Sequence, residues 1–138
     1  MKKYFSRSFS NAKKCVYKGI KFDSQLERDK YIHLLKLQSE GKIEGLKIQV
    51  PFSLIPKIDL SNHIVYSLGK SKKTREAFYV CDFFYKRVID NQYVIMDTKG
   101  RTVPIYRLKL KIILWFYGKR NQFIEVYRDS KRNNFNIY

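Results

Sequence analysis

The sequence predicts one domain of mixed α and β structure. Its 138 residues suit a single hydrophobic core, and a hydrophobic content of 44% excludes global disorder. Two segments carry the apolar spacing of amphipathic helices. Several others are rich in aromatic and β-branched residues and are bounded by turn residues, as strands are.

The N-terminal third is predicted to hold an arm, a hairpin and a helix. Residues 1–14 are polar and basic and are expected to form a flexible arm. Residues 15–22 alternate apolar positions around a glycine, which indicates a short strand or hairpin. A helix is predicted over 24–41, where Ser24 suits the N-cap and Gly41 the C-terminal stop. Its apolar face consists of Leu26, Tyr31, Leu34, Leu35 and Leu37.

Glu27 falls near the middle of that apolar face, where a carboxylate is costly unless something satisfies it. Ser24-x-x-Glu27 is the pattern of a capping box, in which the glutamate folds back to the N-cap amide. A place in a functional site would satisfy the carboxylate equally well. The sequence leaves both interpretations open.

The middle of the chain is predicted to contain one strand and one loop. Residues 42–56 alternate apolar positions around Pro51, which indicates an edge strand or a bulge. Residues 57–76 show no decisive pattern. Their polar and basic part, 69–76, is expected to be a mobile loop.

The C-terminal half is predicted to contain two paired strands, a helix and a last strand. Residues 77–100 indicate two strands joined by a turn at 89–92, and 122–128 indicate another strand. A helix is predicted over 102–118, and its start and end are marked by Thr102, Pro104 and Gly118. Its expected buried side consists of Ile105, Leu108, Ile112, Ile113 and Phe116. The domain then spans 15–128, followed by a polar tail at 129–138.

The charge of the chain indicates a polyanionic partner. The net charge is +17, and nucleic acid rewards lysine and arginine through phosphate neutralisation and counterion release. An anionic membrane surface is a weaker alternative, because the basic residues are spread along the chain and not gathered on one amphipathic helix. No apolar run reaches the roughly 18 to 20 residues that span a bilayer. No secretory signal follows the basic N-terminus, so we expect a cytoplasmic protein.

The two cysteines indicate neither a disulfide nor a zinc site. Cys15 and Cys81 lie far apart and outside any CxxC pattern. With His33 and His63 they form no zinc-ligand spacing. We therefore expect reduced thiols.

Charged residues embedded in the predicted strands single out a candidate site. Asp82 lies in an uncharged run between Glu76 and Lys86, and Asp97 and Lys99 end the next strand. Because side chains alternate along a strand, Asp97 and Lys99 share one face. Antiparallel pairing across the turn would bring Asp82 and Asp97 to the same region of the sheet. Each residue alone also has a purely structural explanation.

Together these residues suit a divalent cation. Asp82, Asp97 and the backbone carbonyl of Thr98 offer the oxygen ligands that Mg²⁺ takes, and Glu27 would complete the acidic cluster. A metal there would activate water and offset charge on a phosphate, and Lys99 would orient the water or stabilise developing charge. The spacing therefore predicts metal-dependent phosphodiester cleavage.

This pattern resembles the PD-(D/E)xK nuclease superfamily. Four blocks also resemble a family of small phage and prophage proteins, domain of unknown function 1064 (DUF1064), which is assigned to that superfamily. The blocks are GIKFDSQLERDKY at 19–31, IQVPFSL at 48–54, YVCDFFY at 79–85 and DTKGRT at 97–102. The resemblance covers residues 15–118.

The resemblance implies a restriction-endonuclease-like core, in which helices flank a central mixed sheet, together with Mg²⁺ or Mn²⁺ and DNA cleavage. The catalytic set that it implies is Glu27, Asp82, Asp97 and Lys99. Gln49 matches a motif position without an assigned role. Cys81 stands where the superfamily usually has proline, and the second acid is aspartate; neither departure removes the chemistry.

The order of the site residues is also similar to that of phage junction-resolving endonucleases, which implies a homodimer that acts on branched DNA. The pairing surface is expected at 1–22 or on the second helix. The basic residues expected to grip phosphates are Lys72, Lys73, Arg75, Arg107, Lys109, Lys111 and Lys119. Two alternatives stay open: a non-catalytic nucleic-acid-binding protein on a nuclease-like fold, and a sequence-specific restriction or transposition nuclease subunit.

Overall fold

The computed structural model describes residues 13–138, so the predicted arm at 1–14 lies almost wholly outside the described residues. Each predicted helix and strand is present close to its expected bounds. In chain order the elements are β1 (Cys15–Tyr17), β2 (Ile20–Phe22), α1 (Gln25–Ser39), β3 (Ile43–Ile55), β4 (Ala77–Arg87), β5 (Gln92–Thr98), α2 (Pro104–Tyr117) and β6 (Asn121–Val126).

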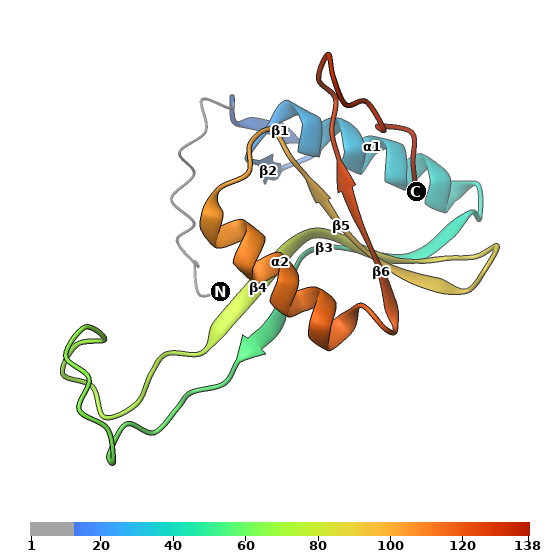
Figure 1. Cartoon of the computed structure of the whole chain (residues 1–138). Coiled ribbons are helices and arrows are strands. Elements are labelled where there is room, and N and C mark those ends of the chain that lie inside the picture. Colours follow the sequence, from blue (N-terminus) through green and yellow to red (C-terminus); the bar gives the residue numbers. More distant parts are fainter. Residues whose placement is uncertain (1–12) are drawn as a thin grey trace.

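Four strands form one mixed sheet in the order β3-β4-β5-β6 (Figure 1). Strands β3, β4 and β5 pair antiparallel, and β6 pairs parallel to β5. A parallel pair needs a crossover connection, which α2 provides. Strand β3 is an edge strand with two register irregularities, as its proline predicts. The predicted α+β class with helices flanking a mixed sheet is confirmed, and it is consistent with a restriction-endonuclease-like core.

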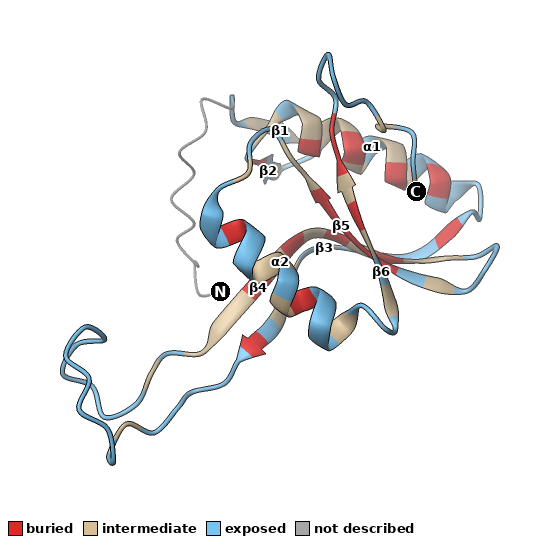
Figure 2. Cartoon of the chain, in the orientation of Figure 1, coloured by how far each residue is buried: buried red, intermediate tan, exposed pale blue. Residues whose placement is uncertain are grey.

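The two helices cover opposite faces of the sheet, and the buried residues gather where helix meets strand (Figure 2). Strand β5 shows the alternation that separates the two halves of the core. Val94 and Met96 belong to the half that includes Leu34 of α1. Ile95 belongs to the half that includes Ile113 of α2. The sheet is therefore apolar on both faces.

Helix α1 buries a stripe that includes two charged residues. The buried residues are Glu27, Lys30, Leu34 and Leu37. Of the five residues predicted for the apolar face, two are buried as predicted and three are only half-buried. The buried ones are Leu34 and Leu37, and the half-buried ones are Leu26, Tyr31 and Leu35. The predicted position of Glu27 inside the buried face is confirmed, whereas the burial of Lys30 was not foreseen.

Lys30 fastens the C-terminal segment to α1. Its ammonium donates to the backbone carbonyls of Phe135 and Ile137, each at 2.6 Å. The side chains of Phe135 and Tyr138 pack against the core on the α1 side. Residues 129–138, predicted as a tail beyond the domain, are therefore part of it. Their apolar and aromatic residues, Phe135, Ile137 and Tyr138, are too few to set a period, so the pattern does not indicate this packing.

Replacing Lys30 by methionine should lower the free energy of unfolding by about 1–3 kcal/mol, because the backbone carbonyls of Phe135 and Ile137 lose their donor. Burial lowers the pKa of Lys30 to about 8, whereas an unfolded lysine keeps its proton to about pH 10.4. Between these values the unfolded state binds more protons, so the contribution of Lys30 to stability rises with pH. Urea unfolding near pH 7.5 and near pH 10 should show a larger wild-type-minus-K30M difference at the higher pH.

Lys36→Met is the matched control for this prediction, because Lys36 lies on the exposed side of the same helix. Its difference from the wild type should be small and the same at both pH values. Equal differences for K30M at the two pH values would contradict the expected shift.

Helix α2 begins at a different N-cap and buries a different side than predicted. Its N-cap is Val103, without a side-chain cap, and not Thr102; Pro104 lies in the first turn as expected. Three residues expected to be buried are exposed, namely Ile105, Leu108 and Phe116. Ile113 is buried as expected, together with Tyr106. Within residues 13–138 no helix is long and apolar enough to cross a membrane.

Two tyrosine hydroxyls set the rotation of α2. The Tyr106 hydroxyl donates to Glu125 of β6, and the Tyr117 hydroxyl donates to the Ser53 carbonyl of β3 at 2.7 Å. Apolar residues occupy most of the circumference of α2, so periodicity alone could not choose its buried side. The polar ends of the two tyrosines fix it, since each hydroxyl reaches an acceptor on the sheet in this rotation.

Candidate active site

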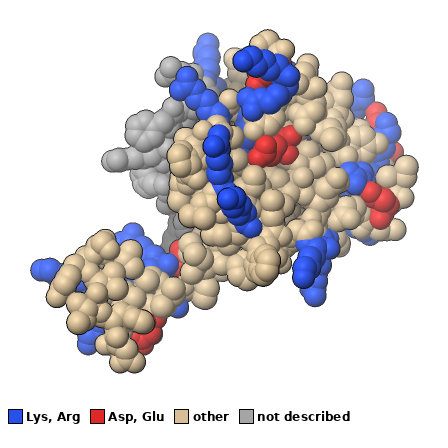
Figure 3. Space-filling model, in the orientation of Figure 1, with Lys and Arg blue, Asp and Glu red and all other residues tan. Residues whose placement is uncertain are grey.

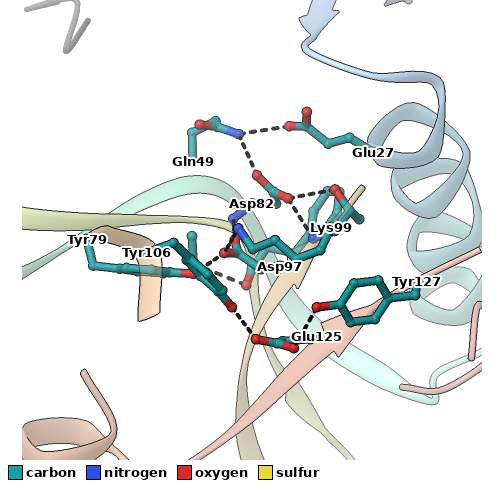
Figure 4. Close-up of polar contacts among 12 residues, drawn as sticks. Glu27, Gln49, Tyr79, Asp82, Asp97, Lys99, Tyr106, Glu125 and Tyr127 are labelled. Atoms are coloured by element: carbon teal, nitrogen blue, oxygen red, sulfur yellow. Dashed lines mark hydrogen bonds and ion pairs between the residues drawn. The ribbon is translucent and has the colours of Figure 1, made fainter. Parts of the chain in front are cut away.

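Three acidic side chains, distant in the sequence, converge where β5 ends (Figure 4). Glu27 comes from the first turn of α1, Asp82 from the middle of β4, and Asp97 from the end of β5. The β4–β5 register pairs Phe83 with Met96, so the next step sets Asp82 opposite Asp97. The Asp82 amide donates to Asp97 Oδ1 at 3.0 Å. The structure thus brings the two aspartates together, as antiparallel pairing predicts.

Glu27 takes part in both the helix cap and the site. The Ser24 hydroxyl accepts from the Glu27 amide at 3.1 Å, which caps α1 as predicted. Glu27 Oε2 accepts from the amide of Asp23 at 3.1 Å, one residue before the amide that a capping box would use. Glu27 Oε1 faces the site and accepts from Gln49. The sequence left open whether Glu27 serves the start of the helix or a functional site. One oxygen of its carboxylate contacts the backbone before the helix, and the other faces the site.

Gln49 bridges Glu27 and Asp82. Its amide nitrogen donates to Glu27 Oε1 at 2.8 Å and to Asp82 Oδ1 at 3.4 Å. The backbone of Gln49 has a φ of 51°, in the left-handed region that residues other than glycine rarely adopt. Such a conformation persists only where the surrounding structure imposes it. Gln49 was matched to a family motif without a role, and the structure shows it holding two carboxylates.

Thr98 fixes the orientation of Asp82. Its amide and its hydroxyl both donate to Asp82 Oδ2 at 2.8 Å. The Thr98 side chain thus points to Asp82, whereas Asp97 and Lys99 contact each other, as alternation along the strand predicts. The backbone carbonyl of Thr98 stays a predicted metal ligand.

An ion pair with Asp97 and a cation–π contact with Tyr106 hold Lys99 in place. Its Nζ lies 2.6 Å from Asp97 Oδ2, and the Asp97 side chain is 2% exposed. The same Nζ lies 4.1 Å from the centroid of the Tyr106 ring, a cation–π contact. The Tyr79 hydroxyl also donates to Asp97 Oδ2. With the Asp82 amide on Oδ1, both oxygens of Asp97 are engaged, and the position of the ammonium is fixed.

Glu125 supports this arrangement from β6. It lies opposite Asp97 in the β5–β6 ladder. One of its oxygens accepts from the Tyr106 hydroxyl, and the other accepts from the Tyr127 hydroxyl at 3.0 Å. Sequence reasoning missed Glu125, although it is an acid embedded in a strand and meets the criterion that singled out Asp82. The tyrosines carried no local signal, because their contacts depend on the rotation of α2.

Within residues 13–138 the acidic cluster has a positive partner at one end only. Burial, and after it the charge of Asp82, raise the pKa of Glu27 above its ordinary value. Burial, and after it the charge of Asp97, raise the pKa of Asp82, against the opposing effect of hydrogen bonds from Thr98. Lys99 contacts Asp97 and lies on the far side from Glu27 (Figure 4). Neighbouring carboxylates with raised pKa values are typical of functional sites.

As the side chains lie, no three Asp, Glu, His or Cys residues between positions 13 and 138 could hold a metal ion. The reason is visible in the hydrogen bonds. Gln49 stands between Glu27 and Asp82, and Lys99 takes Asp97 Oδ2. The carboxylates are nevertheless adjacent, joined by single intervening groups.

The predicted phosphate-gripping residues fall in two places. Lys72, Lys73 and Arg75 are exposed on the long connection between β3 and β4, and Arg107, Lys111 and Lys119 are exposed on or just after α2. Lys109 differs, because it is half-buried and donates to the Phe78 carbonyl at 3.3 Å. This contact gives Lys109 a structural role.

The fold and the site define an α+β domain that presents three carboxylates and one lysine at the end of a mixed sheet. The family model "Protein of unknown function (DUF1064)" matches residues 7–132, and the chain belongs to this family. No curated protein and no solved structure matches the chain significantly. The family resemblance seen in the sequence is confirmed, and the relationship to the PD-(D/E)xK superfamily stays a prediction from the motif.

Proposed function

We propose that the protein is a metal-dependent DNA endonuclease that cuts branched DNA, as a phage-type junction resolvase in the cytoplasm of the bacterial host. The observation that carries the proposal is the convergence of Glu27, Asp82 and Asp97 with the ammonium of Lys99, which lies 2.6 Å from Asp97. The net charge of +17 supports a polyanionic substrate.

The donor set fits Mg²⁺ or Mn²⁺. The side chains that meet at the site are carboxylates, hard oxygen ligands of the kind these ions prefer. Asp82 and Asp97 would hold the ion, with Glu27 and the Thr98 carbonyl as further ligands. When bound, the ion would make water a stronger nucleophile and offset the charge of the phosphate.

The protein's own residues position the Asp97 carboxylate and the Lys99 ammonium, and the ammonium is a hydrogen-bond donor. Tyr79 and the Asp82 amide hold the carboxylate of Asp97, and Asp97 with the Tyr106 ring holds the Lys99 ammonium. An ammonium fixed in this way would donate hydrogen bonds to the attacking water or to a phosphate oxygen without reorganisation at the moment of reaction. Gln49 would keep Glu27 and Asp82 from moving apart.

The direct test is cleavage by the purified protein. With Mg²⁺ or Mn²⁺ we expect a four-way junction to be cut faster than a linear duplex or a single strand of the same sequence, and EDTA to stop the reaction. Binding without cutting under every metal tested would favour the non-catalytic alternative. Cutting at one defined duplex sequence would favour a restriction or transposition nuclease subunit.

We also propose that two copies pair through α2. Its outer surface carries uncovered apolar side chains, and the most exposed are Ile105, Leu108, Trp115 and Phe116, at 58%, 55%, 79% and 61%. Large apolar patches on a protein surface mark interfaces, and a homodimer would place one site on each of two strands.

Trp115→Glu should therefore convert a dimer to a monomer in sedimentation equilibrium, because it places a charge in the middle of the proposed interface. Ile89→Glu is the matched control, since Ile89 is 87% exposed on the β4–β5 turn, away from α2. A W115E protein that stays dimeric would move the interface to the N-terminal residues 1–22. A monomeric wild type would refute the pairing.

A further inference from the structure

The connection between β3 and β4 is a long projection whose two sides are joined by backbone hydrogen bonds. We call residues 56–76 the protruding loop; it extends away from the sheet at the lower left of Figure 1. Its two sides are joined by an isolated antiparallel bridge between Asp59 and Lys73. The Leu60 amide donates to the Lys72 carbonyl at 2.8 Å, and the Thr74 amide donates to the Ile58 carbonyl at 2.9 Å. The sequence shows no decisive pattern over 57–76 and predicts a mobile loop at 69–76. The structure adds backbone hydrogen bonds between the two sides of the loop, and the mobility of 69–76 stays a prediction.

The end of the protruding loop is apolar and uncovered. Ile64, Tyr66 and Leu68 are 85%, 88% and 59% exposed. A turn closed by the Gly69 amide and the Tyr66 carbonyl, at 3.1 Å, shapes this end. Figure 3 shows the loop as a separate lobe with a mostly uncharged surface and lysines or arginines at its margin. Single exposed apolar residues are ordinary, whereas three on one projecting end indicate a contact surface.

The stem of the protruding loop is basic, and its acids are already engaged. Its cations are Lys57, Lys70, Lys72, Lys73 and Arg75, and none of them forms an ion pair within residues 13–138. Asp59 accepts from the amide and the hydroxyl of Ser61, and Glu76 accepts from the Ser53 hydroxyl. Five cations against two carboxylates give the loop a net charge of +3, which is complementary to phosphate and not to this protein's own basic surface.

The protruding loop connects β3 and β4, the strands that carry Gln49 and Asp82. Asp82 lies five residues from the start of β4, so the base of the loop is about 17 Å from the acidic cluster at 3.3 Å per residue. That distance corresponds to about five base-pair steps of duplex. A DNA backbone at the acidic cluster would place a neighbouring part of the same molecule beside the loop.

We propose that the protruding loop is a DNA wedge: its basic stem lies along phosphates, and Ile64, Tyr66 and Leu68 enter an opened base step or groove near a branch. This inference rests on the proposed function and names its substrate class, DNA that is already branched or unstacked. Apolar side chains that insert between bases require unstacking, which costs least where a branch has already disturbed the stack. The loop would thus favour junctions over regular duplex.

The test compares two variants in EDTA, so that binding is measured without cleavage. The tip variant is Ile64→Ser, Tyr66→Ser and Leu68→Ser together. It should bind a four-way junction at least about fivefold more weakly, keep its affinity for linear duplex, and abolish the fluorescence rise of a 2-aminopurine placed next to the branch. The stem variant, Lys72→Gln, Lys73→Gln and Arg75→Gln together, should weaken binding to both DNAs equally. It should also reduce the slope of log K against log salt by up to about 3.

Each other outcome overturns the wedge. A tip variant that binds both DNAs as the wild type does would show that the loop end does not touch DNA. A tip variant that changes the sedimentation of the free protein would assign the loop end to a second copy. If the wild type binds and cuts DNA and the tip substitutions have no effect on binding, the wedge alone is refuted. If the wild type binds neither DNA, the proposed function is refuted as well. Equal melting temperatures of variant and wild type establish that the comparison is between folded proteins.

Discussion

Asp82→Asn and Asp97→Asn are each expected to reduce DNA cleavage about a thousandfold or more. A divalent ion that stabilises developing charge is worth several kcal/mol, and each 1.36 kcal/mol is a factor of ten in rate. Asparagine keeps the shape of the side chain and one acceptor oxygen but removes the charge that would hold the ion. Initial rates on a four-way junction with saturating Mg²⁺ measure the effect.

DNA binding by the same two variants should be unchanged or tighter. Each substitution removes a negative charge from a protein of net charge +17, so repulsion from phosphate falls. Asp90→Asn is the matched control, because Asp90 is an exposed carboxylate on the turn between the same two strands, paired with Arg87 at 2.6 Å. It should cut at the wild-type rate. If D82N also cuts at the wild-type rate, the acids are structural and the non-catalytic alternative stands.

The parts of the fold that the sequence predicts correctly are those encoded within one short segment. The two strands and the turn between them are predicted, but the turn lies at 88–91, one residue before the predicted 89–92. The register that it fixes sets Asp82 opposite Asp97, whereas a turn at 89–92 would have set Asp82 opposite Lys99. Ser24 and Gly41 mark the ends of α1 because capping is a local interaction. The rotation of α2 is different, because its apolar residues surround most of the helix and the deciding bonds come from β3 and β6.

The same distinction applies to the site. Asp97 and Lys99 were placed on one side of β5 by the period of two, which needs no knowledge of the rest of the chain. The role of Gln49 depends on an unusual backbone conformation opposite Asp82, which composition does not reveal. Glu125 depends on the parallel pairing of β6 with β5. A search for acids in strands would therefore find Glu125 but not its pairing with Asp97, and it would miss Gln49 altogether.

Lys99→Met should lower the cleavage rate by about a hundredfold to a thousandfold, the usual loss when one fixed donor to a developing charge is removed. Methionine keeps an unbranched apolar chain that can pack on the Tyr106 ring and loses only the ammonium. Lys99→Arg should recover part of the activity, because a guanidinium keeps the charge but not the compact shape of the donor. Lys86→Met is the matched control, since Lys86 pairs with Glu44 on the β3–β4 ladder away from the acids.

Lys99 also forms an ion pair with a buried acid, so stability and rate must be separated. Removing one partner of a buried pair costs about 2–5 kcal/mol, and Asp97 would keep only the Tyr79 hydroxyl and the Asp82 amide as donors. K99M is therefore expected to melt at a lower temperature than the wild type. A catalytic lysine predicts that the rate of the fully folded variant, measured well below its melting temperature, still falls at saturating Mg²⁺. A purely structural ion pair predicts that the rate per folded molecule is kept while only the melting temperature drops, because Asp82, Asp97 and Glu27 would remain in place to act without it.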